Sequence, residues 1–131
     1  MKTLIVDKNG ALSVREIPVP EYGECQALVK TLSCNGTDMK LIHGSFKNFN
    51  TYPAILGHEG VGRVVETGSR VKHLKVGDMV LLPFLEQETC GLTPGWGAYS
   101  EYAVVGDADA YISSGMGPGT REWSESYLAQ T

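Results

Sequence analysis

The residues most suited to chemistry in this chain are His58 and Glu59, which lie between Gly57 and Gly60. A neutral imidazole can bind a metal, and an adjacent carboxylate can ligate the same metal or orient a ligand. Glycine at 60 and 62 removes side chains where a ligand or another backbone must approach closely. A His-Glu pair beside glycines is weak evidence by itself, since a structural histidine is the simpler interpretation.

The elements that must position this pair are expected to be short strands. Sixteen glycines and six prolines divide the apolar residues into short runs that are typical of an all-β domain. Asn9-Gly10 predicts a tight hairpin turn. A short helical turn is expected over 38–43, and one further helix over 121–130. The predicted strands cover residues 3–7, 12–17, 26–33, 60–66, 79–83 and 99–105.

Composition narrows the class of protein. The chain has 131 residues, 42% of them hydrophobic and 20% charged, which excludes a disordered or fibrous chain. No apolar run is long enough to span a membrane, and a net charge of −4 argues against nucleic-acid binding. Three widely spaced cysteines form no disulfide framework, so we expect a reducing, cytoplasmic location.

The segment 57–80 resembles the zinc-type alcohol dehydrogenases of the medium-chain dehydrogenase/reductase superfamily. The residues match G-H-E-x-x-G-x(5)-G-x(2)-V followed by G-D-x-V, and the resemblance extends to residues 35–38, 53–57 and 97–102. It implies a mainly β fold: a GroES-like β-barrel with short helical turns over residues 1–106. Residues 107–131 are then a tail, or the start of a connection to a nucleotide-binding domain.

The resemblance also implies an activity, which is hydride transfer between a small alcohol or carbonyl substrate and NAD or NADP, assisted by one catalytic zinc. His58 falls on the family's histidine ligand and Glu59 on the carboxylate beside the zinc. Thr37 falls on the hydroxyl that contacts the substrate oxygen, and Asp38 on the acid that supports the histidine. A turn-capping role for Thr37 and Asp38 is the alternative. The protein at full length is expected to be a homo-oligomer.

The cysteine ligand departs from the family pattern. The usual position, three residues before the aspartate, holds Asn35, whereas Cys34 is one place too early. In a regular strand Cys34 would share a face with Leu28, Lys30 and Leu32, away from His58, unless a β-bulge re-aims it. Cys34 and Asn35 are therefore both candidate metal positions, with a buried hydrophobic role as the alternative for Cys34. Asn at this position is common in the zinc-independent quinone and enoyl reductases of the superfamily.

Two other family features are not expected. The stretch 84–98 contains one cysteine, Cys90, whereas the structural zinc site of many relatives needs four. The glycine-rich segment 115–119 lacks the strand and helix of a dinucleotide-binding turn, and one domain of this size cannot also contain a nucleotide-binding domain. The chain by itself is thus expected to be inactive, and a non-catalytic GroES-like binding module is a third interpretation.

Overall fold

The computed structural model describes residues 1–35, 38–45, 51–57, 59–82, 90–93 and 97–115. Strands are the main regular element, as predicted: β1 (Lys2–Val6), β2 (Leu12–Glu16), β3 (Gln26–Asn35), β4 (Ala54–Ile55), β5 (Glu59–Thr67), β6 (Met79–Leu82) and β7 (Tyr102–Gly106). Two short helices complete the fold, α1 (Met39–Ile42) and α2 (Ala108–Ser114).

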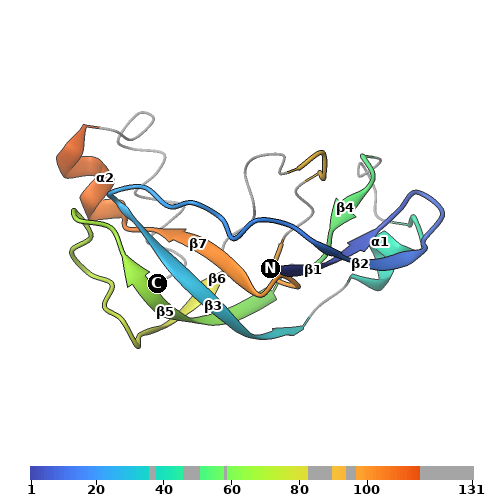
Figure 1. The fold of residues 1–131 in the computed structure, drawn as a ribbon, viewed down its shortest axis with the longest axis horizontal. Coiled ribbons are helices and arrows are strands. Elements are labelled where there is room, and N and C mark those ends of the chain that lie inside the picture. Colours follow the sequence, from blue (N-terminus) through green and yellow to red (C-terminus); the bar gives the residue numbers. More distant parts are fainter. Residues whose placement is uncertain (36–37, 46–50, 58, 83–89, 94–96, 116–131) are drawn as a thin grey trace.

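The strands form two antiparallel sheets that lie beside each other along the length of the molecule (Figure 1). The three-stranded sheet has the order β2-β1-β4, and the four-stranded sheet has the order β6-β5-β3-β7. Within the described residues the two sheets do not close into one barrel. The mainly β fold class is confirmed, with the expected barrel left open in this part of the chain.

The core consists of three clusters of buried side chains. One lies within the four-stranded sheet and includes Val29 and Val64, both fully buried. The second lies around Ile5 and Ile55, and the third includes Val6 and Leu41, so the third cluster joins β1 to α1. The helix that precedes the candidate site is therefore held against the three-stranded sheet by apolar packing.

The β1–β2 hairpin forms at Asn9-Gly10, as predicted. Both Asn9 and Ala11 donate backbone hydrogen bonds to Asp7 Oδ1, at 2.8 and 2.9 Å. Gly10 has a φ of +81°, the left-handed conformation that glycine adopts without steric cost. The turn is thus fixed by its own aspartate.

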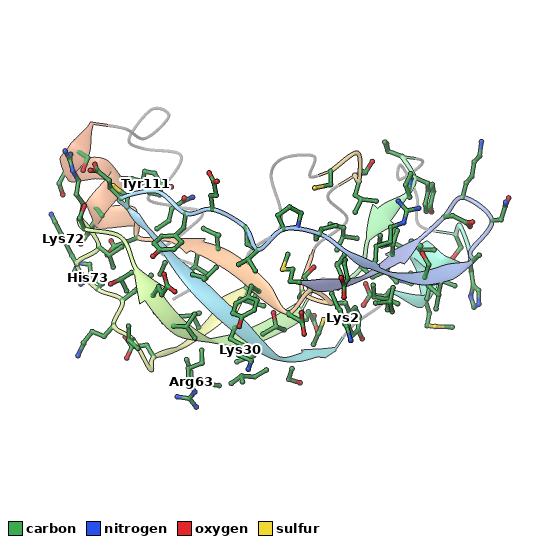
Figure 2. All side chains as sticks on the ribbon, in the orientation of Figure 1. Lys2, Lys30, Arg63, Lys72, His73 and Tyr111 are labelled. Carbon is green, nitrogen blue, oxygen red and sulfur yellow. The ribbon has the colours of Figure 1, made fainter. Side chains whose placement is uncertain are left out.

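Helix α2 was not predicted. Asp107 caps it by accepting from the Ala110 N–H at 3.0 Å, and Gly115 ends it in the left-handed conformation. The other Asp107 oxygen accepts from the backbone N–H groups of Lys72 and His73 at 2.6 and 2.8 Å. Figure 2 shows Lys72 and His73 at the end of the molecule that carries α2. The Asp107 carboxylate joins α2 to the loop between β5 and β6.

Residues 116–131, including the predicted helix 121–130, lie outside the described residues, and so the boundary between 106 and 107 stays a prediction. No helix in the described part of the chain has the length and apolar character needed to cross a membrane.

Candidate functional site

The face of β3 that carries Cys34 is set by a β-bulge. The register of β3 against β5 shifts between Thr31 and Ser33, so that Leu32 has no partner on β5. Thr31 pairs with Gly62 and Cys34 pairs with Gly60. Since Gly60 and Gly62 are two residues apart on β5, they share one face of the sheet, and their partners share it too.

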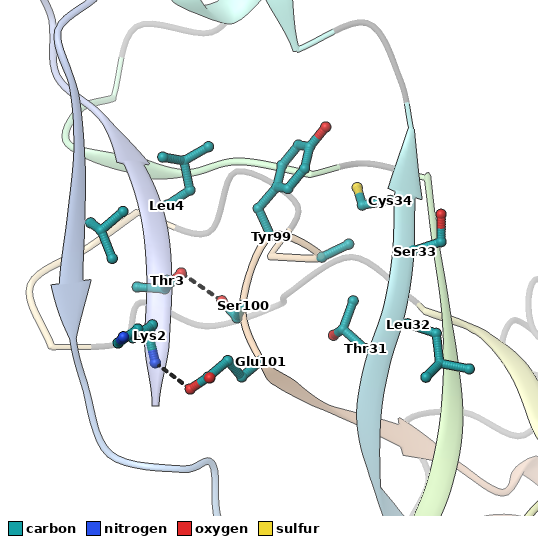
Figure 3. A pocket seen from close by; sticks show the side chains of 12 residues that line it. Lys2, Thr3, Leu4, Thr31, Leu32, Ser33, Cys34, Tyr99, Ser100 and Glu101 are labelled. Atoms are coloured by element: carbon teal, nitrogen blue, oxygen red, sulfur yellow. Dashed lines mark hydrogen bonds between the residues drawn. The ribbon is translucent and has the colours of Figure 1, made fainter.

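The expected strict alternation along β3 is therefore wrong beyond Thr31. The bulge places Cys34 on the same face as Thr31 and on the face opposite to Leu32. Figure 3 shows the Thr31 and Cys34 side chains turned toward Tyr99 and Ser100, while those of Leu32 and Ser33 point away. The bulge depends on how β3 pairs with β5, which the period of one strand cannot reveal.

Cys34 lines a pocket of about 450 Å³ at the open side between the two sheets. Its wall comes from β1, β2, β3 and the segment 98–101, and three of its large apolar side chains, Val14, Leu32 and Tyr99, are exposed. The hydroxyl groups of Thr3 and Ser100 are 2.6 Å apart and buried below this pocket. Tyr99 therefore belongs to the pocket wall.

The local environment keeps both Cys34 and Tyr99 neutral in the metal-free chain. Burial raises the pKa of the Cys34 thiol, and the Asp38 carboxylate raises it further, against hydrogen bonds from the Glu59 backbone and from the Tyr99 side chain. Burial also raises the pKa of Tyr99 above its usual value. A cation bound to Cys34 would favour the thiolate, because thiolate is the form that ligates metals.

Asp38 is buried, with 5% of its surface exposed, and it lies at the N-cap position of α1. Its side chain makes no capping hydrogen bond to the helix. Instead Oδ1 accepts from the Gly57 N–H at 2.8 Å, which connects α1 to the residue directly before His58. The Asp38 side chain thus does not cap the turn, which was the alternative role for this residue.

The second oxygen of Asp38, Oδ2, is buried and has no hydrogen-bond partner among the described residues. A buried carboxylate oxygen without a donor costs free energy, so such an atom is usually satisfied by a neighbouring donor or a cation. This atom and the re-aimed Cys34 thiol are the two observations that fit a metal site here.

Gly57 is required by the backbone of the facing segment. It has a φ of +101°, and a Cβ at this position would lie 2.5 Å from the Tyr99 N atom. The Gly57 carbonyl accepts from the Ala98 N–H at 3.0 Å. Gly57 is consequently in direct contact with residues 98–99 of the pocket wall.

The remaining predicted site residues are only partly described. His58 and Thr37 lie outside the described residues. Glu59 is exposed at the start of β5, where it pairs with Asn35. The register puts Glu59 and Gly60 on opposite faces of the sheet, so Glu59 and Cys34 lie on opposite faces. In the described part of the chain, no three histidine, cysteine or acidic side chains are grouped in a way that could hold a metal.

Comparisons with known proteins give the same family as the sequence motifs. Residues 22–113 match the family model of the alcohol dehydrogenase GroES-like domain. An alcohol dehydrogenase of Geobacillus stearothermophilus is 40% identical over 94 residues, which cover 70% of this chain and 27% of the relative. An NADP-dependent isopropanol dehydrogenase of Entamoeba histolytica is 37% identical, and the match covers 86% of this chain and 37% of that enzyme.

The solved structures agree with this relationship. The crystal structure of galactitol-1-phosphate dehydrogenase from Escherichia coli is 29% identical with a TM-score of 0.63, covering 82% of this chain and 36% of that protein. The chain thus spans only about a third of the length of these relatives. The match to the family model over most of the chain, together with the shared fold, shows that this protein belongs to the alcohol dehydrogenase GroES-like domain family.

Proposed function

We propose that this chain is the substrate- and metal-binding part of a zinc-type, nicotinamide-dependent dehydrogenase acting on a small alcohol or polyol. The family match and the two dehydrogenase relatives support this class of reaction. The nicotinamide cofactor, NAD or NADP, is expected to bind to a further domain that these 131 residues do not contain.

The observation that carries the proposal is the position of Cys34. The cysteine is displaced by one residue from the family pattern, and the bulge at Leu32 returns it to the pocket face. It lies there near the Asp38 carboxylate, which raises the pKa of its thiol. A displaced ligand together with a compensating bulge is consistent with retention of the metal site.

In this proposal Cys34 and His58 hold the metal. A zinc ion bound there would act as a Lewis acid on the oxygen of the alcohol or carbonyl substrate. Asp38 holds the Gly57 N–H and so fixes the backbone from which His58 extends. Glu59 adds a carboxylate near the ligand residues, on the other face of β5. Thr37 supplies the hydroxyl that would contact the substrate oxygen and start the relay that carries its proton away.

Metal analysis tests the proposal directly. We expect the purified chain to bind one zinc per molecule, with Cys34→Ser and His58→Ala each weakening binding by about 10- to 100-fold. Cys90→Ser is the matched control, since Cys90 is exposed and outside the pocket. Unchanged zinc content in both site variants, or loss in the control as well, would contradict this metal site.

A zinc-independent reductase of the same superfamily is the second candidate, and Asn35 is the observation that favours it. Zinc binding by the unaltered chain separates the two functions. A zinc site with a displaced cysteine ligand should bind zinc and lose affinity in Cys34→Ser. A chain from a zinc-independent reductase should bind no zinc in either form.

A further inference from the structure

The β1–β2 hairpin turn touches helix α1 through one glycine. Gly10 lies so close to the C-terminal end of α1 that a Cβ on it would be 2.5 Å from the Ile42 carbonyl oxygen and 3.5 Å from its carbon. Both of these atoms are backbone, so the contact could not be relieved by a change of rotamer. Any side chain at position 10 must therefore move the hairpin or the helix.

Helix α1 transmits such a movement to Asp38. It has four residues, and the Ile42 N–H donates to the Asp38 carbonyl at 3.0 Å, which makes the two residues the ends of one helical turn. Buried Leu41 and its carbonyl, which accepts from the Tyr52 hydroxyl at 3.1 Å, hold the turn on the protein. A displacement of the Ile42 backbone is consequently expected to displace the Asp38 backbone as well.

Asp38 in turn holds the Gly57 N–H through its buried carboxylate. From these three contacts we infer that Gly10 is a positioning residue for the candidate metal site. It acts through Ile42 and Asp38 on the backbone at Gly57, the residue before His58. This inference rests on the proposed function only for its metal readout, because the contacts themselves involve no metal.

The chain contains a matched control for this inference. Gly77 also has a positive φ, +99°, but a Cβ there would have no neighbour within 4 Å. Gly10→Ala and Gly77→Ala therefore share the backbone strain of an L-residue at positive φ, whereas only the first adds a collision with α1. Gly10→Asn is a milder second variant, because asparagine tolerates positive φ while still carrying a Cβ.

The first measurement is hydrogen exchange of the Gly57 amide by NMR in the metal-free chain, relative to the Val64 amide. We expect exchange at Gly57 to accelerate about tenfold in Gly10→Ala and Gly10→Asn, and by less than about twofold in Gly77→Ala. Equal acceleration in all three variants, or no acceleration in any of them, overturns the inference.

The second measurement is zinc affinity, determined by competition with a chromophoric chelator. Both Gly10 variants should bind zinc about 10- to 100-fold more weakly, while Gly77→Ala should stay within about twofold of the parent. Unaltered zinc affinity in the Gly10 variants overturns the positioning role. A parent chain that binds no zinc contradicts the proposed function instead, and exchange at Gly57 then decides the inference alone.

Discussion

Close packing by neighbouring protein atoms explains why β5 carries glycine at positions 60 and 62. At Gly62 a Cβ would lie 2.3 Å from Val29 Cγ1 and 2.9 Å from the Lys30 carbonyl oxygen. The sequence predicted that side chains had to be absent at 60 and 62, but left a ligand and another strand as equal explanations. The structure identifies neighbouring protein atoms as the reason at both positions.

Substitution at Gly62 should therefore be costly. We expect Gly62→Ala to lower the free energy of unfolding by about 1–3 kcal/mol or more, because the methyl group overpacks a rigid sheet. Gly23→Ala is the control, since its nearest neighbour would be a side-chain oxygen at 3.4 Å. Urea denaturation of the two variants measures the difference, and equal costs would contradict this explanation.

At the scale of elements, the strands were predictable because glycine and proline divide the apolar residues into short runs. Six strands were predicted and found with shifted ends, and α1 occupies the predicted turn. The two-residue strand β4 was missed because it is too short to show a period. Helix α2 was missed for another reason: the segment 108–114 has no clear apolar periodicity. Its signal was the cap pair, Asp107 before the helix and Gly115 after it.

Removal of the bulge in β3 should leave Cys34 on the pocket face of the sheet. Deletion of Leu32 leaves Thr31 and Ser33 adjacent, opposite Gly62 and Val61, so the pairing of Cys34 with Gly60 is expected to persist. The rate at which a thiol reagent modifies Cys34 measures this, in chains with Cys25→Ala and Cys90→Ser. We expect a rate within about threefold of the undeleted chain. An unreactive Cys34 would mean that it had turned to the other face.

The attachment of α2 to the loop between β5 and β6 should weaken at low pH. Burial alone would raise the pKa of Asp107, but the N–H groups of His73, Lys72 and Ala110 outweigh it and hold the pKa below its usual value. A carboxyl whose folded pKa is depressed stabilises the fold above its unfolded pKa, about 3.9. That stability is lost as the pH falls below this value and through the folded pKa.

Asp107→Asn tests this dependence. The variant should be less stable than the parent at pH 7, and the difference should shrink as the pH falls below about 4 and the parent carboxyl becomes protonated. Urea denaturation at each pH gives the comparison. Asp109→Asn is the control, because Asp109 lies on the exposed side of α2, paired with His73. A difference that does not change with pH would contradict the role of Asp107.

At the scale of the whole molecule, the segment 99–101 joins the two sheets. The Leu4 N–H donates to the Tyr99 carbonyl and the Glu101 N–H donates to the Lys2 carbonyl, at 3.0 and 3.1 Å. On the other side, the Thr31 N–H of β3 donates to the Glu101 carbonyl at 3.0 Å. The segment 99–101 thus hydrogen-bonds to β1 in one sheet and, through Glu101, to β3 in the other.

The buried Thr3–Ser100 pair provides a measure of this coupling. Ser100→Ala leaves the Thr3 hydroxyl buried without its partner, which should cost about 1–3 kcal/mol of unfolding free energy. In the Thr3→Val, Ser100→Ala double variant both polar groups are gone, so the combined cost should be smaller than the sum of the single costs. Additive costs in a double-mutant cycle would show that the pair does not couple the sheets.

These hydrogen bonds on both sides of 99–101 also fix the width of the pocket. Sliding one sheet against the other would break these backbone hydrogen bonds. They therefore hold the opening between the sheets at one width, whatever the size of the bound molecule. The size of molecule that fits is instead set by the exposed side chains on the pocket wall, Val14 and Tyr99. Selectivity here can therefore be re-engineered by exchanging two surface residues, with no change to the framework behind them.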